Sequence, residues 1–118
     1  KKQGKSVLLI EPTTHVGGMS SGGLGMTDIG NKYVVKGIAL DFYRRLGSYY
    51  GSLEKWVFEP KVAEKIFKDY IAEENIELWC NRRIVDARKE GDRIVNITLE
   101  DSMARATIRC RLITSASA

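Results

Sequence analysis

The sequence has only two cysteines, one histidine and no long hydrophobic run. Cys80 and Cys110 fit neither the spacing of a metal-binding motif nor a disulfide framework. A membrane-spanning helix needs about 18 apolar residues in succession, and no segment approaches that length. We therefore expect no metal site and no membrane span, and we interpret both cysteines as small buried hydrophobic residues in a reducing compartment.

The start of the chain also lacks a secretory signal, which would contain an apolar stretch of about 7–15 residues. Lys1 and Lys2 lead into only four apolar residues, and Glu11 ends that run. We therefore expect a cytoplasmic protein. A length of 118 residues, with 43% hydrophobic and 29% charged residues, is typical of a single soluble globular domain.

The formal net charge of +4 suggests a nucleic-acid partner, but the distribution of the basic residues argues against one. Lysines and arginines alternate with acidic residues, and Glu64 and Lys68 are spaced as neighbours on one helix face. The densest basic cluster, Arg82-Arg83, has no interleaved aromatic residues. We expect no nucleic acid among the partners, and a basic nucleic-acid binder is the weakest of the hypotheses.

The first third of the chain combines a helix end, a strand and a glycine-rich loop. Residues 1–4 resemble the last turn of a helix that Gly4 ends. The apolar run 6–10 is typical of a strand buried on both faces of a parallel sheet. Residues 13–31 hold six glycines without periodicity, which indicates an ordered loop or a loop around one short helix.

Residues 32–75 form the helical segment, where apolar residues recur at three- and four-residue spacing. Gly51 separates two such stripes, and Pro60 suits the first turn of the second helix. The first stripe consists of Ile38, Phe42, Leu46 and Tyr49, and the second of Val62, Ile66 and Tyr70 with Ala63, Phe67 and Ile71 beside it.

The rest of the chain is predicted to be β. Residues 76–79 form a short strand, and three longer strands follow. The last two of these show the period-two alternation of half-buried antiparallel strands. The longer strands cover residues 84–89, 93–99 and 104–113. The expected fold is α/β, with a parallel sheet plus an antiparallel β-meander in one domain over residues 1–118.

Glu11 stands at the end of the predicted buried strand. A carboxylate at this place in a dinucleotide-binding fold accepts hydrogen bonds from the adenosine ribose, although a solvated strand-end glutamate is the simpler interpretation. The matching G-x-G-x-x-G turn lies about 20 residues earlier, which would fall before Lys1. We therefore expect the first strand and the phosphate loop to be missing together, which leaves an open sheet edge that residues 108–113 partly close.

The loop after Glu11 contains two glycine pairs, Gly17-Gly18 and Gly22-Gly23. Residues without a Cβ let backbone amides approach an anion or a flat ring, and Ser20 and Ser21 add hydroxyl groups. A mobile linker is the alternative, but linkers seldom contain so many interleaved apolar residues. The pattern favours an anion- or cofactor-binding loop.

The stretch Gln3-Gly4-Lys5-Ser6-Val7-Leu8-Leu9-Ile10-Glu11-Pro12 resembles the second-strand region of FAD-dependent oxidoreductases. These enzymes have the glutathione-reductase-like fold, and the fumarate reductase flavoprotein subunit is one of them. The next motif resembles one bacterial family of that group, known as FAD-dependent oxidoreductases. It reads His15-x-Gly17-Gly18-Met19-x-Ser21-Gly22-Gly23-Leu24-Gly25. The likeness covers nearly the whole chain. It continues through Phe42-Tyr43, Trp56-x-Phe58-Glu59-Pro60-x-Val62-Ala63-Glu64 and Arg83-Ile84-Val85.

The resemblance implies a Rossmann-like FAD-binding domain fragment from a parent that transfers hydride or electrons to or from an unknown small molecule. It places the adenosine ribose at Glu11, the pyrophosphate, ribitol and flavin along the glycine loop, and the adenine at Ile84. Catalytic residues are expected elsewhere in the parent, since the flavin carries the redox chemistry. The implied cofactor-binding residues are Glu11, Pro12, Gly17, Gly18, Met19, Ser20, Gly23 and Ile84.

Two alternatives stay open at this point. The chain can be a non-enzymatic truncated product, or an anion- or nucleotide-binding module without turnover. His15, the only histidine, can be a proton shuttle near neutral pH or a structural hydrogen-bonding residue, and the second is the more common role of a lone loop histidine.

Overall fold

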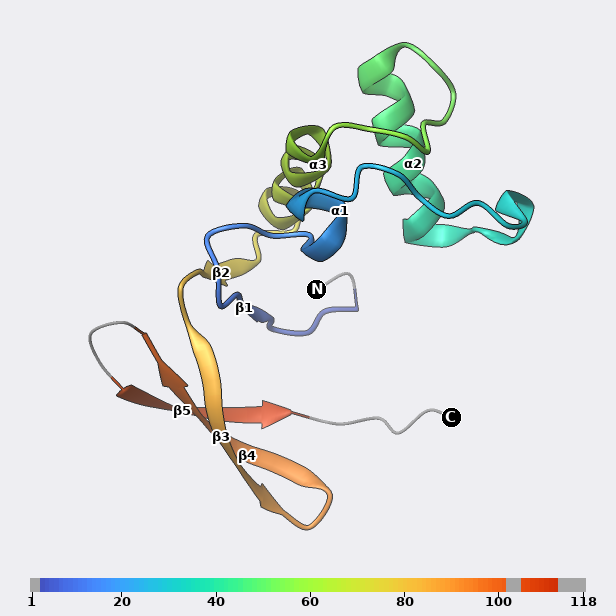
Figure 1. Cartoon of the computed structure of the whole chain (residues 1–118). Coiled ribbons are helices and arrows are strands. Elements are labelled where there is room, and N and C mark those ends of the chain that lie inside the picture. Colours follow the sequence, from blue (N-terminus) through green and yellow to red (C-terminus); the bar gives the residue numbers. More distant parts are fainter. Residues whose placement is uncertain (1–2, 102–104, 113–118) are drawn as a thin grey trace. The chain divides into compact units, whose positions relative to one another are not determined.

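The computed structural model describes residues 3–101 and 105–112, which form two compact units (Figure 1). Unit 1 holds residues 3–8 and His15–Glu77, and unit 2 holds Leu9–Thr14 and the described residues from Leu78 onward. The elements in chain order are β1 (Leu8–Ile10), α1 (Gly18–Gly22), the 3-10 helix η1 (Lys32–Val34), α2 (Gly37–Tyr50), α3 (Pro60–Glu73), β2 (Glu77–Trp79), β3 (Arg83–Glu90), β4 (Arg93–Glu100) and β5 (Arg105–Leu112).

β1 and β2 pair in a small parallel sheet, which confirms the strands predicted at 6–10 and 76–79. The expected burial of the first strand is wrong: Val7 is 36% and Leu9 38% exposed. The physical reason is that β1 has only β2 as a neighbour among the described residues, and a strand is buried on both faces only inside a covered sheet.

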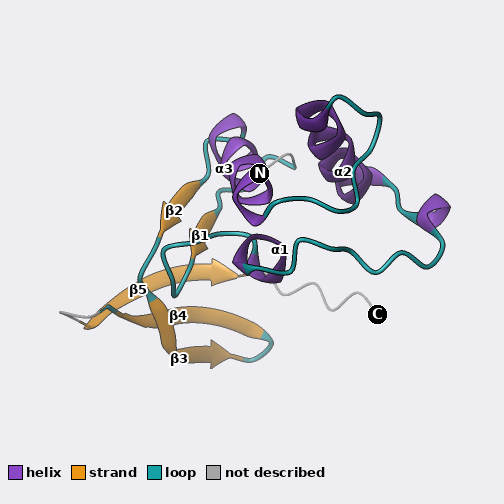
Figure 2. Ribbon diagram, turned by 45° about the horizontal axis from the view of Figure 1, so that its top comes forward, coloured by secondary structure: helices purple, strands orange, loops and turns teal. Residues whose placement is uncertain are grey.

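β3, β4 and β5 form a three-stranded antiparallel sheet in that order, which confirms the predicted β-meander (Figure 2). On β4, Ile97 and Leu99 are buried and Val95 is half-buried, as their alternation predicts. β5 pairs with β4, so the expectation that residues 108–113 close an edge beside β1 is wrong for the described part of that segment. The side chains predicted to alternate along β5, Cys110 included, lie outside the described residues.

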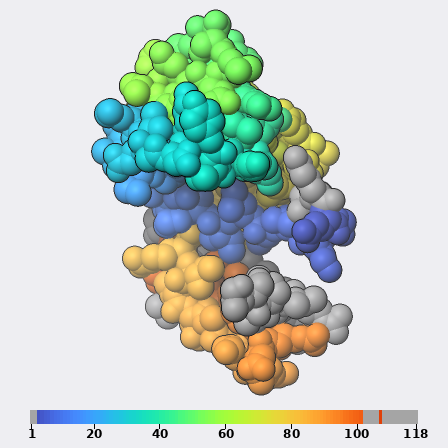
Figure 3. All heavy atoms as spheres, turned by 90° about the vertical axis from the view of Figure 1, so that its right-hand side faces the viewer, coloured from blue at the N-terminus to red at the C-terminus, as the bar shows by residue number. Residues whose placement is uncertain are grey.

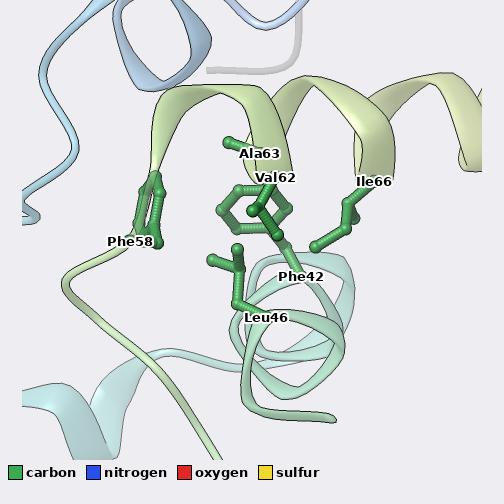
Figure 4. Close-up of a cluster of buried hydrophobic side chains, with 6 residues drawn as sticks. All are labelled: Phe42, Leu46, Phe58, Val62, Ala63 and Ile66. Atoms are coloured by element: carbon green, nitrogen blue, oxygen red, sulfur yellow. The ribbon is translucent and has the colours of Figure 1, made fainter. Parts of the chain in front are cut away.

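α2 and α3 pack against each other and enclose the core of unit 1 (Figure 4). The predicted stripes supply most of this core, but Ile38 and Tyr49 at the two ends of the first stripe are 66% and 57% exposed. Both lie near the ends of α2, beyond the part of the helix that the core covers. The buried cluster consists of Phe42, Leu46, Phe58, Val62, Ala63 and Ile66.

The ends of the two long helices follow from local chemistry. Gly51 adopts φ +72° and donates its N–H to the Gly47 carbonyl, which ends α2. A Cβ at Gly47 would lie 2.5 Å from the Ser52 carbonyl oxygen, so only glycine lets the following turn pass. Pro60 begins α3, as predicted. Gly4 has the expected left-handed conformation, whereas Lys1 and Lys2 of the predicted helix end lie outside the described residues.

A polar network also joins α2 to α3. Arg45 donates to both Glu73 oxygens, at 2.5 and 2.9 Å, and to Asp41 Oδ2 at 2.9 Å. Its guanidinium lies 4.1 Å from the centre of the Tyr70 ring, and the Tyr70 hydroxyl donates to Asp41. The hydrogen bond to Glu73 raises the pKa of Arg45 and lowers that of Glu73, while desolvation and the Asp41 hydrogen bond raise the pKa of Tyr70.

None of the helices in the described part of the chain has the length and apolar character needed to cross a membrane.

Candidate cofactor site

The glycine-rich loop of unit 1 is ordered around the short helix α1, which is one of the two predicted forms. The Ser21 hydroxyl donates to the Val16 carbonyl at 2.5 Å, and the Val16 side chain is buried. Farther along, Met26 forms an isolated antiparallel bridge with Val57, and Phe58 N–H donates to the Gly25 carbonyl at 2.7 Å. The loop is therefore fixed to the body of unit 1 at both ends, unlike a linker.

The first glycine pair combines two different roles. A Cβ on Gly17, at φ +108°, would overlap the Phe67 ring on α3, so Gly17 is needed for packing. A Cβ on Gly18, at φ +55°, would meet no atom within 4 Å. Gly23, at φ +136°, faces open space in the same way. The backbone at Gly18 and Gly23 is thus accessible to a ligand, whereas that at Gly17 is covered.

Gly18, Met19, Gly22, Gly23 and Leu24 line a shallow hollow of about 460 Å³ on unit 1. Met19 and Leu24 are 75% and 61% exposed, so their side chains add accessible apolar surface to the hollow. Among the described residues, no charged side chain lines the hollow, so it suits a flat apolar ring better than an anion.

Three of the predicted cofactor residues, Gly18, Met19 and Gly23, meet in this hollow. Ser20 does not line it and instead faces a separate cavity of unit 1 with Phe42, Phe67 and other residues.

In unit 2, Glu11 holds the turn that follows β1. Its Oε1 accepts hydrogen bonds from the Thr13 amide at 2.8 Å and from the Thr13 hydroxyl at 2.7 Å. The main chain of Glu11 donates to the Trp79 carbonyl at 2.9 Å and accepts from the Arg82 amide at 3.1 Å. Both side-chain bonds use Oε1, so Oε2 can accept from a further donor. Pro12, the next residue, is exposed.

Trp79 and Arg82, whose main chains form these hydrogen bonds with Glu11, also contact each other through their side chains. The Arg82 guanidinium lies 5.1 Å from the centre of the Trp79 ring, and its Nη1 lies 3.6 Å from Asp101 Oδ2. Ile84, two residues beyond Arg82, is 51% exposed near the start of β3. The sequence analysis did not predict this contact between Trp79 and Arg82. The feature that could have indicated it is their three-residue spacing across the end of a predicted strand.

His15 contacts α3 rather than standing free in the loop. Its Nδ1 lies 3.1 Å from Glu64 Oε1, and the Lys68 ammonium lies 2.8 Å from the same oxygen. The hydrogen bond from Lys68, and to a smaller degree that from His15, lowers the pKa of Glu64. This contact favours the structural interpretation of His15, which attaches the loop to α3.

Among the side chains that the structure describes, which do not include Cys110, no group of three or more His, Cys, Asp or Glu is placed to hold a metal ion. Cys80 is a free thiol, and it is only half-buried.

Comparison with known protein families gives a match along the entire chain. The sequence model of the family described as FAD dependent oxidoreductase matches residues 1–118. The chain belongs to this family. Comparison with curated proteins found no match, and comparison with solved structures found none. Membership of the FAD-dependent oxidoreductases confirms the resemblance seen in the sequence and implies FAD as the cofactor.

The structure of this FAD-dependent oxidoreductase chain is compatible with part of an FAD-binding fold, since it contains helices, a small parallel sheet and an antiparallel sheet. Family membership also indicates a flavin redox function. Each unit, taken by itself, has one feature that fits a part of FAD in chemical type. Unit 1 has an open apolar hollow lined by glycines, and unit 2 has the Glu11 carboxylate, whose Oε2 can accept a further hydrogen bond.

Proposed function

We propose that this chain forms part of a Rossmann-like FAD-binding domain in an enzyme that transfers hydride or electrons between FAD and a small molecule. The observation that carries the proposal is the uncharged hollow at α1, where two glycines with positive φ have nothing at their Cβ positions. Glycine in such a conformation costs folding entropy, and close approach of a ligand to the backbone is a reason to keep it.

The hollow is proposed to hold the flavin ring. Gly18 and Gly23 give access to the backbone, and Met19 offers an exposed apolar side chain. Gly17 acts indirectly, by letting the loop pack on Phe67. Ser20 faces another cavity, so we assign its part in cofactor binding to its backbone within the loop.

A separate proposal concerns Glu11 and the adenosine part of FAD. Glu11 accepts the ribose hydroxyls through Oε2, because Thr13 already occupies Oε1. Pro12 follows Glu11 and fixes its extended backbone. Ile84 offers backbone groups to the adenine, and the Trp79–Arg82 pair supplies a ring and a cation beside Glu11.

When bound, the flavin supplies the hydride or electron transfer, while this chain binds and orients it. No charged side chain of the described residues lines the hollow, which argues against the alternative of a simple anion-binding module. The substrate and the catalytic groups are not assigned to residues of this chain.

The test is FAD affinity of the full chain and of a Gly18→Val variant, measured by titration and by flavin absorbance after gel filtration. Valine at Gly18 would place three carbons into the hollow, and we expect affinity to fall at least about tenfold, or 1.4 kcal/mol. Gly91→Val is the matched control, because Gly91 has φ +60° and an equally open Cβ position, but lies in the β3–β4 turn. Equal FAD affinity of the Gly18 and Gly91 variants would refute flavin binding at the hollow.

A further inference from the structure

Unit 1 contains a larger cavity at a different place. It has a volume of about 770 Å³ and lies between η1, the first half of α2 and the connection from α2 to α3. In Figure 3, the cyan segment with η1 lies beside the green α2–α3 connection on the visible face of unit 1. Small-molecule sites commonly have volumes of about 300–1,000 Å³. The cavity shares no lining residue with the α1 hollow.

Positive charge exceeds negative charge around this cavity. Its charged lining residues are Lys32, Lys36, Arg44 and Glu54. Glu54 is engaged locally: its Oε1 lies 3.8 Å from Arg44 Nε, and its Oε2 accepts from the Trp56 indole at 3.3 Å. Within the described residues, Lys32 and Lys36 form no ion pair. The two ammonium groups therefore lack an acidic partner at the wall of a cavity.

Other lining residues of the cavity are apolar. Trp56 is buried and stacks on Tyr43 with the ring centres 3.8 Å apart, and Leu40 also lines the cavity. Gly37, the first residue of α2, also lines the cavity, and the first turn of α2 contains no acidic residue. The positive end of the α2 dipole thus adds to the potential of the two lysines.

We propose that this cavity binds a small organic anion, in which an apolar body carries a carboxylate or phosphate group. The apolar body packs on Trp56 and Leu40, and the anionic group lies at Lys32 and Lys36. Lysine ammonium groups without acidic partners are suited to this role because an anion satisfies their charge without displacing an existing ion pair. The proposal is independent of flavin binding, since the two sites share no lining residue, and the lining of the α1 hollow is uncharged whereas that of the cavity is cationic.

The test uses nuclear magnetic resonance of the ¹⁵N-labelled full chain, because it locates the ligand as well as measuring affinity. The probes are 3-phenylpropionate and phenyl phosphate, and 3-phenylpropionamide is the neutral analogue. We expect saturable shifts at the Gly37 amide and the Trp56 indole N–H. The amide analogue should bind at least about tenfold more weakly than the carboxylate. Relative affinities of the two anions distinguish a carboxylate site from a phosphate site.

A Lys36→Gln variant should weaken carboxylate binding about fivefold or more, and a Lys32→Gln, Lys36→Gln double variant should weaken it further. Lys65→Gln is the control, since it removes the same charge from α3 outside the cavity, where Lys65 pairs with Asp69. The proposal is overturned if neither probe gives saturable shifts at Gly37 and Trp56 up to about 20 mM. Equal binding of the amide and the carboxylate, or equal effects of the Lys36 and Lys65 variants, would also overturn it.

Discussion

Replacement of Gly17 by alanine tests whether this glycine serves the packing of the loop. Gly17 has φ +108°, which an alanine residue adopts only with strain, and its Cβ would overlap the Phe67 ring. Ser21 Oγ, which holds the Val16 carbonyl, would lie 2.8 Å from the same Cβ. The substitution therefore strains the backbone and displaces the Phe67 ring and the Ser21 hydroxyl at once.

The magnitude follows from these two causes. A non-glycine residue in a left-handed conformation costs about 1–2 kcal/mol, and overpacking costs about 1–3 kcal/mol more. The total loss of about 2–5 kcal/mol is large beside a typical unfolding free energy of about 5–15 kcal/mol. Gly18→Ala is the matched comparison, because it carries the backbone strain at φ +55° but meets no atom within 4 Å.

Urea denaturation measures the difference directly. With a slope of about 1.5 kcal/mol per molar, Gly17→Ala should lower the midpoint by roughly 1.5–3 M and Gly18→Ala by roughly 1 M. In a Phe67→Ala background, which removes the ring, Gly17→Ala should cost only the backbone strain and the displacement of Ser21 Oγ. The coupling energy between the two substitutions should therefore be up to about 1–3 kcal/mol. If the two glycine substitutions cost the same, or if removal of the ring leaves the cost of Gly17→Ala unchanged, the packing role is wrong.

Three further predictions concern the cofactor, the helix pair and the strand β1. Glu11→Ala should weaken FAD binding about 10- to 150-fold, or ~1.5–3 kcal/mol. Glu11→Gln should weaken FAD binding less, because the amide oxygen can still accept from Thr13. Equal FAD titrations of wild type and Glu11→Ala would contradict the ribose assignment. Arg45 lowers the pKa of Glu73 in the folded state, so the Arg45–Glu73 ion pair stabilises the fold above the unfolded pKa of about 4.3, and this stabilisation is lost as pH falls through the lowered pKa. The difference in urea midpoint between wild type and Arg45→Ala should therefore shrink from pH 7 to about pH 3, and an unchanged difference would count against the ion pair. Leu9 is 38% exposed on β1, so the chain should self-associate in light scattering and Leu9→Lys should reduce this, whereas a wild-type monomer at about 50 µM would exclude such pairing.

The elements were predictable where local chemistry decides them. Gly51 and Pro60 mark the end of α2 and the start of α3 because one supplies a left-handed backbone and the other a fixed φ in the first turn. The alternation on β4 likewise predicts the buried Ile97 and Leu99. Burial of β1 was not predictable from its own four apolar residues, because it depends on which strands lie beside it.

The candidate site was predictable only in part for the same reason. Motif resemblance selects Gly18, Met19 and Gly23, and the structure brings these three together. The Trp79–Arg82 pair and the His15–Glu64 contact join residues whose relation depends on how strands and helices end and pack. The cationic cavity was missed because Lys32, Lys36 and Arg44 appear in the sequence as ordinary solvated charges.

The glycine loop shows why a motif does not by itself identify ligand contacts. A Cβ on Gly17 would overlap Phe67 and one on Gly25 would overlap the Phe58 carbonyl, so both glycines are needed by the fold even without a ligand. Gly18, Gly22, Gly23 and Gly30 would gain a Cβ in open space, and of these only the first three line the α1 hollow. Because the family motif contains glycines of both kinds, substitution of Gly17 or Gly25 would reduce FAD binding through loss of structure. The flavin proposal therefore depends on Gly18 and Gly23, where a loss of affinity can occur while the fold is retained.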